Sequence, residues 1–159
     1  MPMVAGEQAP QRPCGVERQA VMYVVIVGCG RLGALLADGL SVAGHEVVVI
    51  DRQEASFRAL SPEFSGFRLT GDATEHALLE SAEVGRADCL MATCSEDTLN
   101  LMVAQVARHV FGVACVLARV HQPAFGAIFK DAGIQIISPT QLAFDAFCAT
   151  LDEGANRQS

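Results

Sequence analysis

The chain has 159 residues, of which 51% are hydrophobic and 18% charged, and its formal net charge is −7. This length is typical of one domain, and the composition is that of a globular protein. An acidic chain without a basic patch cannot offset a phosphate backbone, so nucleic acid is not expected as a partner. The longest apolar run, Ala20–Val27, is about half as long as a membrane-spanning helix needs to be. We therefore interpret it as a strand.

The first predicted elements form a strand, a turn and a helix. Residues 1–19 hold three prolines and two glycines without periodicity, which predicts a flexible N-terminal arm. Val21–Val27 then has the continuous apolar pattern of a strand buried on both faces. The turn that follows is Gly28-Cys29-Gly30-Arg31-Leu32-Gly33, a GxGxxG pattern. It opens a helix whose expected apolar face consists of Leu32, Leu35, Leu36 and Leu40.

A second strand, His45–Ile50, is followed by Asp51, about 20 residues after the glycines, where a ribose-binding acid is expected. Gly28 permits the tight turn, Gly30 lets the backbone approach a pyrophosphate, and Gly33 lets the helix pack close to the sheet. The Asp51 carboxylate would accept hydrogen bonds from ribose hydroxyls and repel a 2′-phosphate. This favours NAD, ADP or ATP over NADP. A glycine-rich turn without a ligand is the alternative.

Strand and helix patterns alternate through the rest of the chain. Further strands are predicted over 67–70, 88–92, 114–120 and 134–137. Further helices are predicted over 51–60, over 75–81 capped by Thr74, from the cap Ser95 to Val110, from Pro123 to Gly133, and from Ser138 to Leu151. The expected apolar faces of the last three are Leu99, Met102, Val103, Val106 and Val110, then Phe125, Ile128 and Phe129, then Leu142, Phe144, Phe147 and Leu151.

This alternation predicts an α/β fold, namely a Rossmann-like, doubly wound, parallel six-stranded sheet with helices on both faces. The nucleotide-binding domain is expected over 20–151, with a polar tail over 152–159. The cysteines show no CxxC pair and no zinc-ligand spacing, so buried, reduced thiols in a cytosolic protein are the favoured interpretation. They are Cys14, Cys29, Cys89, Cys94, Cys115 and Cys148.

The histidines are not expected to form a catalytic site. His45, His76 and His109 fall in a turn or on helix surfaces. His121 stays a candidate, because it follows the carboxyl end of a strand, where α/β proteins bind ligands. The sequence contains no Ser-His-Asp order, nucleophile elbow or metal-ligand cluster. Neither catalysis nor a bound metal is therefore expected.

Five ordered motifs resemble the TrkA-N family, the N-terminal domain of RCK proteins. They are Gly-Cys-Gly-Arg-Leu-Gly from Gly28, Val-Ile-Asp-Arg up to Arg52, Gly-Asp-Ala-Thr from Gly71, Thr-Cys-Ser-Glu-Asp-Thr-Leu-Asn from Thr93, and Ala-Arg-Val from Ala118. The resemblance covers residues 23–140. It implies a Rossmann-like domain that binds NAD(H), ATP, ADP or AMP and forms dimers. It also implies a cytoplasmic ring of dimers beneath a membrane potassium channel, in which the protein is a regulatory subunit and not an enzyme.

The resemblance also assigns individual residues to the nucleotide pocket. Residues 28–33 match the phosphate loop, and Asp51 matches the ribose acid. The other assigned positions are Arg31, Thr93, Cys94 and Arg119 on the phosphate side, and Arg52, Asp72 and Ala73 on the adenine or ribose side. Alternatives stay open for three residues. Arg119 has a structural ion pair as its alternative, Asp72 a role in the turn alone, and Asn100 a bridging role within its helix, which we favour over ligand contact.

The leading hypothesis is a nucleotide-sensing regulatory subunit of a Trk/Ktr-type potassium uptake system, cytoplasmic and peripheral to the inner face of the membrane. The alternatives are a small NAD-dependent oxidoreductase, or the cofactor half of one, with His121 as proton donor, and a stand-alone nucleotide-binding module. Two departures from the family limit what is carried over. Its C-terminal ligand-binding subdomain is not seen, and Lys130 stands near the position where some relatives have a metal-binding acid. The apolar residues of the last helix are expected to pack either on a partner subunit or on their own domain.

Overall fold

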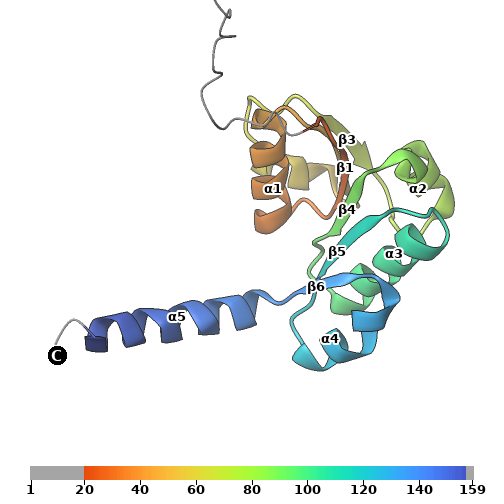
Figure 1. Cartoon of the computed structure of the whole chain (residues 1–159). Helices are drawn as coiled ribbons and strands as arrows, with labels where there is room; N and C mark the ends of the chain where they lie inside the picture. The colour runs from red at the N-terminus through yellow and green to blue at the C-terminus, as the bar shows by residue number, and fades with distance from the viewer. Residues whose placement is uncertain (1–19, 157–159) are drawn as a thin grey trace, which may run out of the picture.

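In the computed structural model, which describes residues 20–156, six parallel strands form one sheet in the order β3-β2-β1-β4-β5-β6. Helices lie on both of its sides, with α1 on one side and α2 and α3 on the other (Figure 1). The predicted fold class is confirmed. The strands are β1 Tyr23–Val27, β2 Glu46–Asp51, β3 Phe67–Thr70, β4 Cys89–Ala92, β5 Cys115–Arg119 and β6 Gln135–Ile137.

The connections between strands are α-helices or single 3-10 turns. The helices are α1 Arg31–Val42, α2 His76–Ser81, α3 Asp97–His109, α4 Pro123–Phe129 and α5 Pro139–Asn156. The 3-10 turns are η1 Glu54–Ala59, η2 Val84–Arg86 and η3 Lys130–Ala132. The chain runs outward from β1 to β3, then returns to place β4 on the other side of β1. The strand order reverses between β1 and β4, and ligands of open α/β sheets bind at the carboxyl ends of strands at such a point.

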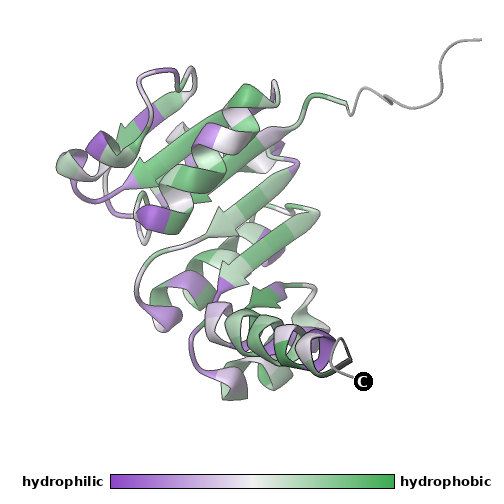
Figure 2. Ribbon diagram, turned by 90° about the vertical axis from the view of Figure 1, so that its left-hand side faces the viewer, coloured by the Kyte–Doolittle hydropathy of each residue, from purple (hydrophilic) through white to green (hydrophobic). Residues whose placement is uncertain are grey.

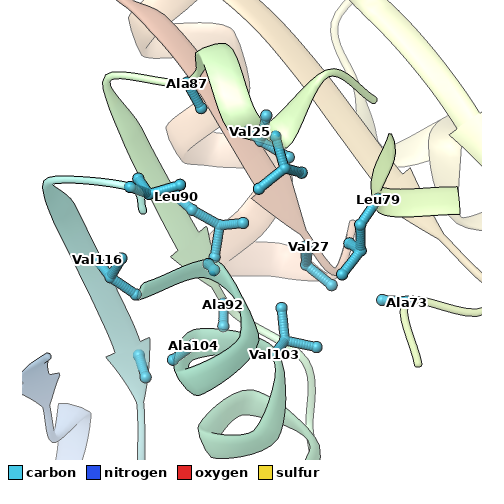
Figure 3. Close-up of a cluster of buried hydrophobic side chains, with 14 of the residues drawn as sticks. Val25, Val27, Ala73, Leu79, Ala87, Leu90, Ala92, Val103, Ala104 and Val116 are labelled. Carbon is cyan, nitrogen blue, oxygen red and sulfur yellow. The ribbon is translucent and has the colours of Figure 1, made fainter. Parts of the chain in front are cut away.

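The core has two layers, one on each face of the sheet. Val24 and Ile26 of β1 belong to the layer beneath α1, whereas Val25 and Val27 belong to the layer beneath α2 and α3 (Figure 3). All four side chains are at most 1% exposed. Figure 2 shows the central strands as continuous hydrophobic ribbons for the same reason. Burial on both faces explains why this strand has an unbroken apolar pattern and not an alternating one.

The apolar face predicted for α1 is partly wrong. Leu35 is 72% exposed, and the residues that α1 buries are the small Gly33, Ala34 and Ala37. Leu36 and Leu40 pack at the side of this contact and are half-buried. Small residues on the inner face bring the helix axis close to the sheet, and this turns the larger leucines away from the centre of the contact.

The predicted face of α3 is also shifted. Met102 and Val110 are exposed, at 40% and 63%, and Ile128 of α4 is 68% exposed. The residues that α3 buries are Asn100, Leu101, Val103, Ala104 and Ala107. The helix therefore rests on its alanines, with a polar residue inside the contact.

Several local predictions also need correction. Residues 51–60 do not form an α-helix, since η1 covers only Glu54–Ala59. Thr74 and Ser95 do not cap their helices, because α2 begins at His76 and α3 begins at Asp97. The N-cap residues are Glu75 and Glu96, and neither makes a side-chain cap hydrogen bond among the described residues. Cys115 and Cys148 are exposed, against the expectation that the cysteines are buried. Cys14 and the expected arm over 1–19 lie outside the described residues.

The last helix leaves the domain. In Figure 1, α5 extends from the end of β6 away from the sheet and from the other helices. Its large apolar side chains are 59–74% exposed, namely Leu142, Phe144, Phe147 and Leu151. The alternative that they pack on their own domain is therefore wrong. The helix continues to Asn156, into the segment expected as a polar tail. Over residues 20–156, no helix combines the length and the apolar character that crossing a membrane requires.

Gly33 allows α1 to lie directly against the end of β1, and it provides a test of this packing. A Cβ at this position would stand 1.8 Å from the carbonyl oxygen of Gly28. Gly33→Ala is therefore expected to lower the free energy of unfolding by about 3 kcal/mol, because the backbone must move apart. Gly39→Ala in the same helix is the control, since nothing lies within 4 Å of its Cβ. This control should raise stability by about 0.5–1 kcal/mol. Urea unfolding measures both, and equal stability of the two variants would contradict the packing.

Candidate nucleotide-binding site

A cleft of about 640 Å³ opens at the carboxyl ends of the strands, at the point where the strand order reverses. Ten of the thirteen residues predicted for the site line it. They are Gly28, Gly30, Arg31, Asp51, Arg52, Asp72, Ala73, Thr93, Cys94 and Arg119. The other three, Cys29, Leu32 and Gly33, belong to the loop and helix behind the cleft and are not among its lining residues. The cleft thus draws together residues from five strand ends that lie far apart in the sequence.

The glycine loop is fixed by backbone contacts across the strand ends. Gly28 has a φ of +102°, and a Cβ there would meet the backbone nitrogen of Cys94 at 2.8 Å. The backbone N–H of Gly28 donates to the carbonyl of Ile50 at 2.8 Å, and the hydroxyl of Thr93 donates to the carbonyl of Gly28 at 2.9 Å. The loop is held between β2 and β4, so its backbone has little freedom to move.

The N-terminus of α1 faces the cleft without a side-chain partner of its own. Gly30 is the backbone cap and makes no side-chain cap bond, and the first turn of α1 has no acidic residue. The first N–H groups of a helix carry partial positive charge and bind anions. Arg31 lines the same part of the cleft. Since open space surrounds the Cβ position of Gly30, a ligand can approach the backbone here.

Asp51 is held at the end of β2 by two backbone donors. The N–H of Cys29 donates to Oδ2 and the N–H of Gln53 donates to Oδ1, both at 2.8 Å. The carboxylate therefore links the glycine loop to the loop after β2. The side chain of Cys29 is 1% exposed and packs in the core, and burial raises the pKa of its thiol to about 11. This agrees with a space-filling role and not with a reactive thiol.

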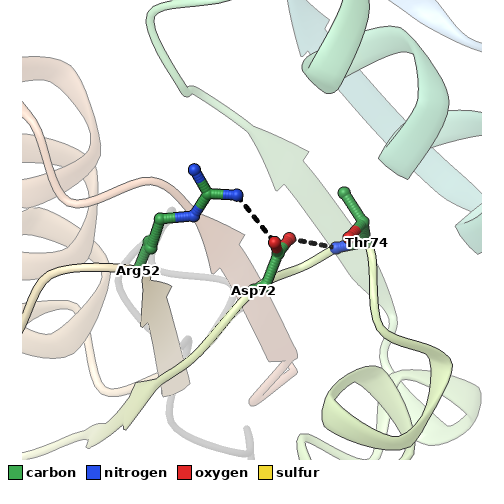
Figure 4. A network of polar contacts seen from close by, with 3 residues as sticks. All are labelled: Arg52, Asp72 and Thr74. Atoms are coloured by element: carbon green, nitrogen blue, oxygen red, sulfur yellow. Dashed lines mark hydrogen bonds and ion pairs between the residues drawn. The ribbon is translucent and has the colours of Figure 1, made fainter.

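An ion pair lies among the residues that line the cleft, at the ends of β2 and β3 (Figure 4). The guanidinium of Arg52 donates to Asp72 at 2.7 Å, and the backbone N–H of Thr74 donates to the same carboxylate at 2.9 Å. The Thr74 bond first, and then Arg52, lower the pKa of Asp72 to about 2. Asp72 is thus both a turn residue and a cleft residue, so the two alternatives for it are compatible. The Arg52 side chain is 74% exposed, so a ligand can approach the ion pair from solvent.

Asn100 organises the opposite wall and was not among the predicted site residues. It is completely buried, and its amide accepts from the N–H of Cys94 at 2.8 Å. It donates to the carbonyl of Cys94 at 2.7 Å and to that of Arg119 at 2.9 Å. It therefore bridges, as we favoured, although it does so from α3 to the ends of β4 and β5 and not within its own helix.

Arg119 carries an unused donor inside the cleft. One guanidinium nitrogen donates to the carbonyl of Cys94 at 2.8 Å. Its Nε is buried and lacks a hydrogen-bond partner among the described residues. An ion pair between described residues, the alternative considered for Arg119, is not formed. Because an orphaned buried donor is costly, this group fits an anionic ligand held in the cleft.

Further residues line the cleft without having been predicted. They are Val27, Ile50, Gln53, Ser56, Gly71, Thr74, Ser95, Glu96 and Leu99. Most lie within three residues of a predicted position, so counting outward from each strand end would have found them. His121 is absent from this lining, is exposed, and donates its backbone N–H to Asp97 at 2.9 Å. Over residues 20–156, no cluster of three His, Cys, Asp or Glu side chains is arranged to hold a metal ion.

The chain matches a known family over most of its length. The model of the TrkA-N domain matches residues 24–139. A Trk system potassium uptake protein TrkA from Streptomyces coelicolor is 39% identical over 124 residues, which make up 78% of this chain and 56% of that protein. A TrkA homolog from Pyrococcus horikoshii is 31% identical over 135 residues, or 85% of this chain and 57% of that protein. The chain thus spans little more than half the length of these relatives.

Solved structures of low sequence identity share the fold. The TrkA-N domain of the inner membrane protein ybaL from Escherichia coli has a TM-score of 0.73 at 21% identity, covering 84% of this chain and 99% of that one. A structure of GsuK bound to ADP has a TM-score of 0.69 at 24% identity, and the match covers 84% of this chain and 34% of that one. The GsuK channel bound to NAD has a TM-score of 0.62 at 21% identity, and the match covers 78% of this chain and 22% of that one.

Proposed function

Since the chain belongs to the TrkA-N domain family, we propose that it is a nucleotide-binding regulatory subunit of a potassium uptake system. The observation that carries the proposal is the cleft itself. It combines an uncapped helix N-terminus, a fixed carboxylate at Asp51 and the orphaned Nε of Arg119 in one place. The helix N-terminus suits one phosphate, the carboxylate suits a ribose, and the arginine suits a second phosphate. The names of the relatives supply potassium uptake as the process.

The ligand is an adenine nucleotide or NAD(H). Related structures were solved with ADP, NAD and AMP, which supports this class for the present chain. The phosphates contact Gly30, Arg31 and Arg119, and the ribose contacts Asp51. The adenine lies toward Arg52 and Asp72, whose ion pair borders that end of the cleft. The negative charge of Asp51 disfavours a 2′-phosphate and therefore NADP.

The subunit acts by binding and not by catalysis. His121, the proton donor on which an oxidoreductase would depend, is exposed and lies outside the cleft lining. A nucleotide shifts the balance between two arrangements of the assembly by its differential affinity for them. The assembly is cytoplasmic and contacts a membrane potassium transporter at the inner face of the membrane.

The chain forms a homodimer, the unit of a larger ring, and α5 contributes the contact. Three large apolar residues, Phe144, Phe147 and Leu151, recur at helical spacing along α5 and are 61–74% exposed. Exposing such an apolar stripe to water costs free energy in a monomer. Burial against a second copy removes the stripe from water.

Nucleotide binding is expected to raise the unfolding temperature. A ligand at a hundred times its dissociation constant adds about 2.7 kcal/mol of stability, or roughly 5–10 °C for a domain of this size. NAD, NADH, ATP, ADP and AMP are compared with NADPH by scanning calorimetry. Asp51→Ala should weaken the ribose-containing ligands by about 1–3 kcal/mol, because their hydroxyls lose a charged acceptor. Glu63→Ala, which removes an exposed carboxylate elsewhere, is the control and should bind as the natural chain does. Unchanged unfolding temperatures, with no nucleotide released on denaturation, would contradict the pocket.

Dimer formation is expected to depend on the apolar side of α5. Phe147→Asp places a charge in the contact and should convert the dimer to monomer, which light scattering during size-exclusion chromatography measures. Ala149→Asp adds the same charge on the opposite side of the helix, at an exposed position, and should leave the dimer intact. A monomeric natural chain at micromolar concentration would refute the proposed contact.

Deletion of the gene is expected to reduce potassium uptake. Uptake is measured as rubidium-86 influx into cells grown on limiting potassium. The natural sequence should restore influx in the deletion strain, whereas Asp51→Ala should restore it less, because its nucleotide binding is weakened. Glu63→Ala should restore influx fully. Equal influx with and without the gene would argue against a role in potassium transport, even where nucleotide binding is confirmed.

A further inference from the structure

Two cysteines face each other on neighbouring strands, at the edge of the sheet opposite the cleft. Cys89 begins β4 and Cys115 begins β5, and the two are direct partners in the parallel register. The thiol of Cys89 donates to Sγ of Cys115 at a sulfur–sulfur distance of 3.4 Å. Partnered residues of parallel strands project to the same face of the sheet, which brings the two sulfurs into contact.

The two thiols have unequal environments. Cys89 is 4% exposed and packs in the core layer beneath α1, and burial, followed by its contact with Cys115, raises the pKa of its thiol to about 12. Cys115 is exposed. An oxidant in solution therefore reaches Cys115 first, while Cys89 is shielded and held behind it as the resolving thiol.

We propose that Cys89 and Cys115 form a modification site, a cysteine pair that a hydroperoxide oxidises to a reversible intrachain disulfide. The Cys115 thiolate attacks the peroxide oxygen, which breaks the O–O bond, gives Cys115 sulfenic acid and releases an alkoxide or hydroxide that takes up a proton. The Cys89 sulfur then attacks Sγ of Cys115, forms the S–S bond and expels the sulfenic oxygen as water with the Cys89 proton. The two thiols lose two electrons to the peroxide.

The strand geometry accommodates this bond without separating the sheet. Neighbouring strands lie about 4.8 Å apart, and disulfides join Cα atoms roughly 4.4–6.8 Å apart. The sulfurs have to close from 3.4 Å to about 2.05 Å, which rotation of the two side chains can supply. A disulfide between adjacent strands is also open to reductants on the side of Cys115, and exposed disulfides are the more easily reduced ones.

The remaining described cysteines differ from this pair. Cys29 and Cys94 are buried or half-buried, with thiol pKa values raised to about 11 chiefly by burial. Cys148 is exposed on α5 and has no sulfur partner within the described residues. It therefore serves as the matched control for exposure without a partner. The pair lies at the opposite end of β4 from Cys94 and the cleft, so its chemistry is independent of the nucleotide proposal.

The test treats the full chain with hydrogen peroxide and maps its thiols by tryptic mass spectrometry without reduction. The expected product is one linked pair of peptides, 87–108 with 109–119, lighter by two hydrogen atoms and restored by dithiothreitol, in which fragment ions place the bond at Cys89 and not at Cys94. Cys148→Ser should give the same pair. Cys89→Ser should leave Cys115 as a sulfenic acid that dimedone traps, whereas Cys115→Ser should leave Cys89 reduced.

Three results would overturn the proposal. The first is that both thiols stay reduced under peroxide that fully oxidises Cys148. The second is that Cys115 proceeds to sulfinic acid in the natural chain as readily as in Cys89→Ser, which would mean that Cys89 does not resolve it. The third is that Cys115 links to another cysteine. Circular dichroism before and after treatment, on the natural chain and on each variant, tests whether the linked pair arises in the folded state.

Discussion

The architecture of the cleft depends on one close approach, that of α1 to the ends of β1 and β4. The missing side chain of Gly33 lets the helix lie against the carbonyl of Gly28, and the hydroxyl of Thr93 donates to that same carbonyl. The Gly28 carbonyl thus joins a helix, a loop and a strand at the point where the strand order reverses. Everything that the cleft presents on this side, from the backbone of Gly30 to Arg31, is placed by this contact.

A second, polar constraint holds the other wall. The buried amide of Asn100 fixes the backbone of Cys94 and the carbonyl of Arg119. Buried amides are tolerated when their bonds are made, and here the three bonds are made to backbone groups that a strand end would otherwise leave unpaired. The guanidinium of Arg119 is anchored by the same carbonyl of Cys94. The wall is therefore pre-formed, and its remaining unpartnered donor is directed to what occupies the cleft.

Much of the fold follows from patterns that are local in the sequence. The double burial of β1, the glycines and the position of Asp51 together predict a doubly wound parallel sheet and the end of that sheet at which a ligand is expected. Helix faces were less predictable, because periodicity identifies a stripe but not which part of it touches the sheet. In α1 the small residues form the face that touches the sheet, since Ala34 and Ala37 are buried and Leu35 is not. Asn100 was expected to act within its own helix, whereas its partners lie at the ends of two strands, 6 and 19 residues away in the sequence.

The placement of the cleft limits how a ligand can act on the rest of the chain. Asp51 and Asp72 follow β2 and β3, on one side of the point where the order reverses, whereas Cys94 and Arg119 belong to β4 and β5 on the other. A ligand bound to both sides spans two strands, β1 and β4, whose register is continuous over four residue pairs, so the sheet itself offers no hinge. The groups of the cleft that lie outside the sheet are the exposed Arg52 with its ion pair and the loops that follow the strands. A ligand shifts an assembly only by contacting its two states differently. We expect such a difference to arise outside the sheet, in the loops that line the cleft or in α5, which extends away from the other described elements.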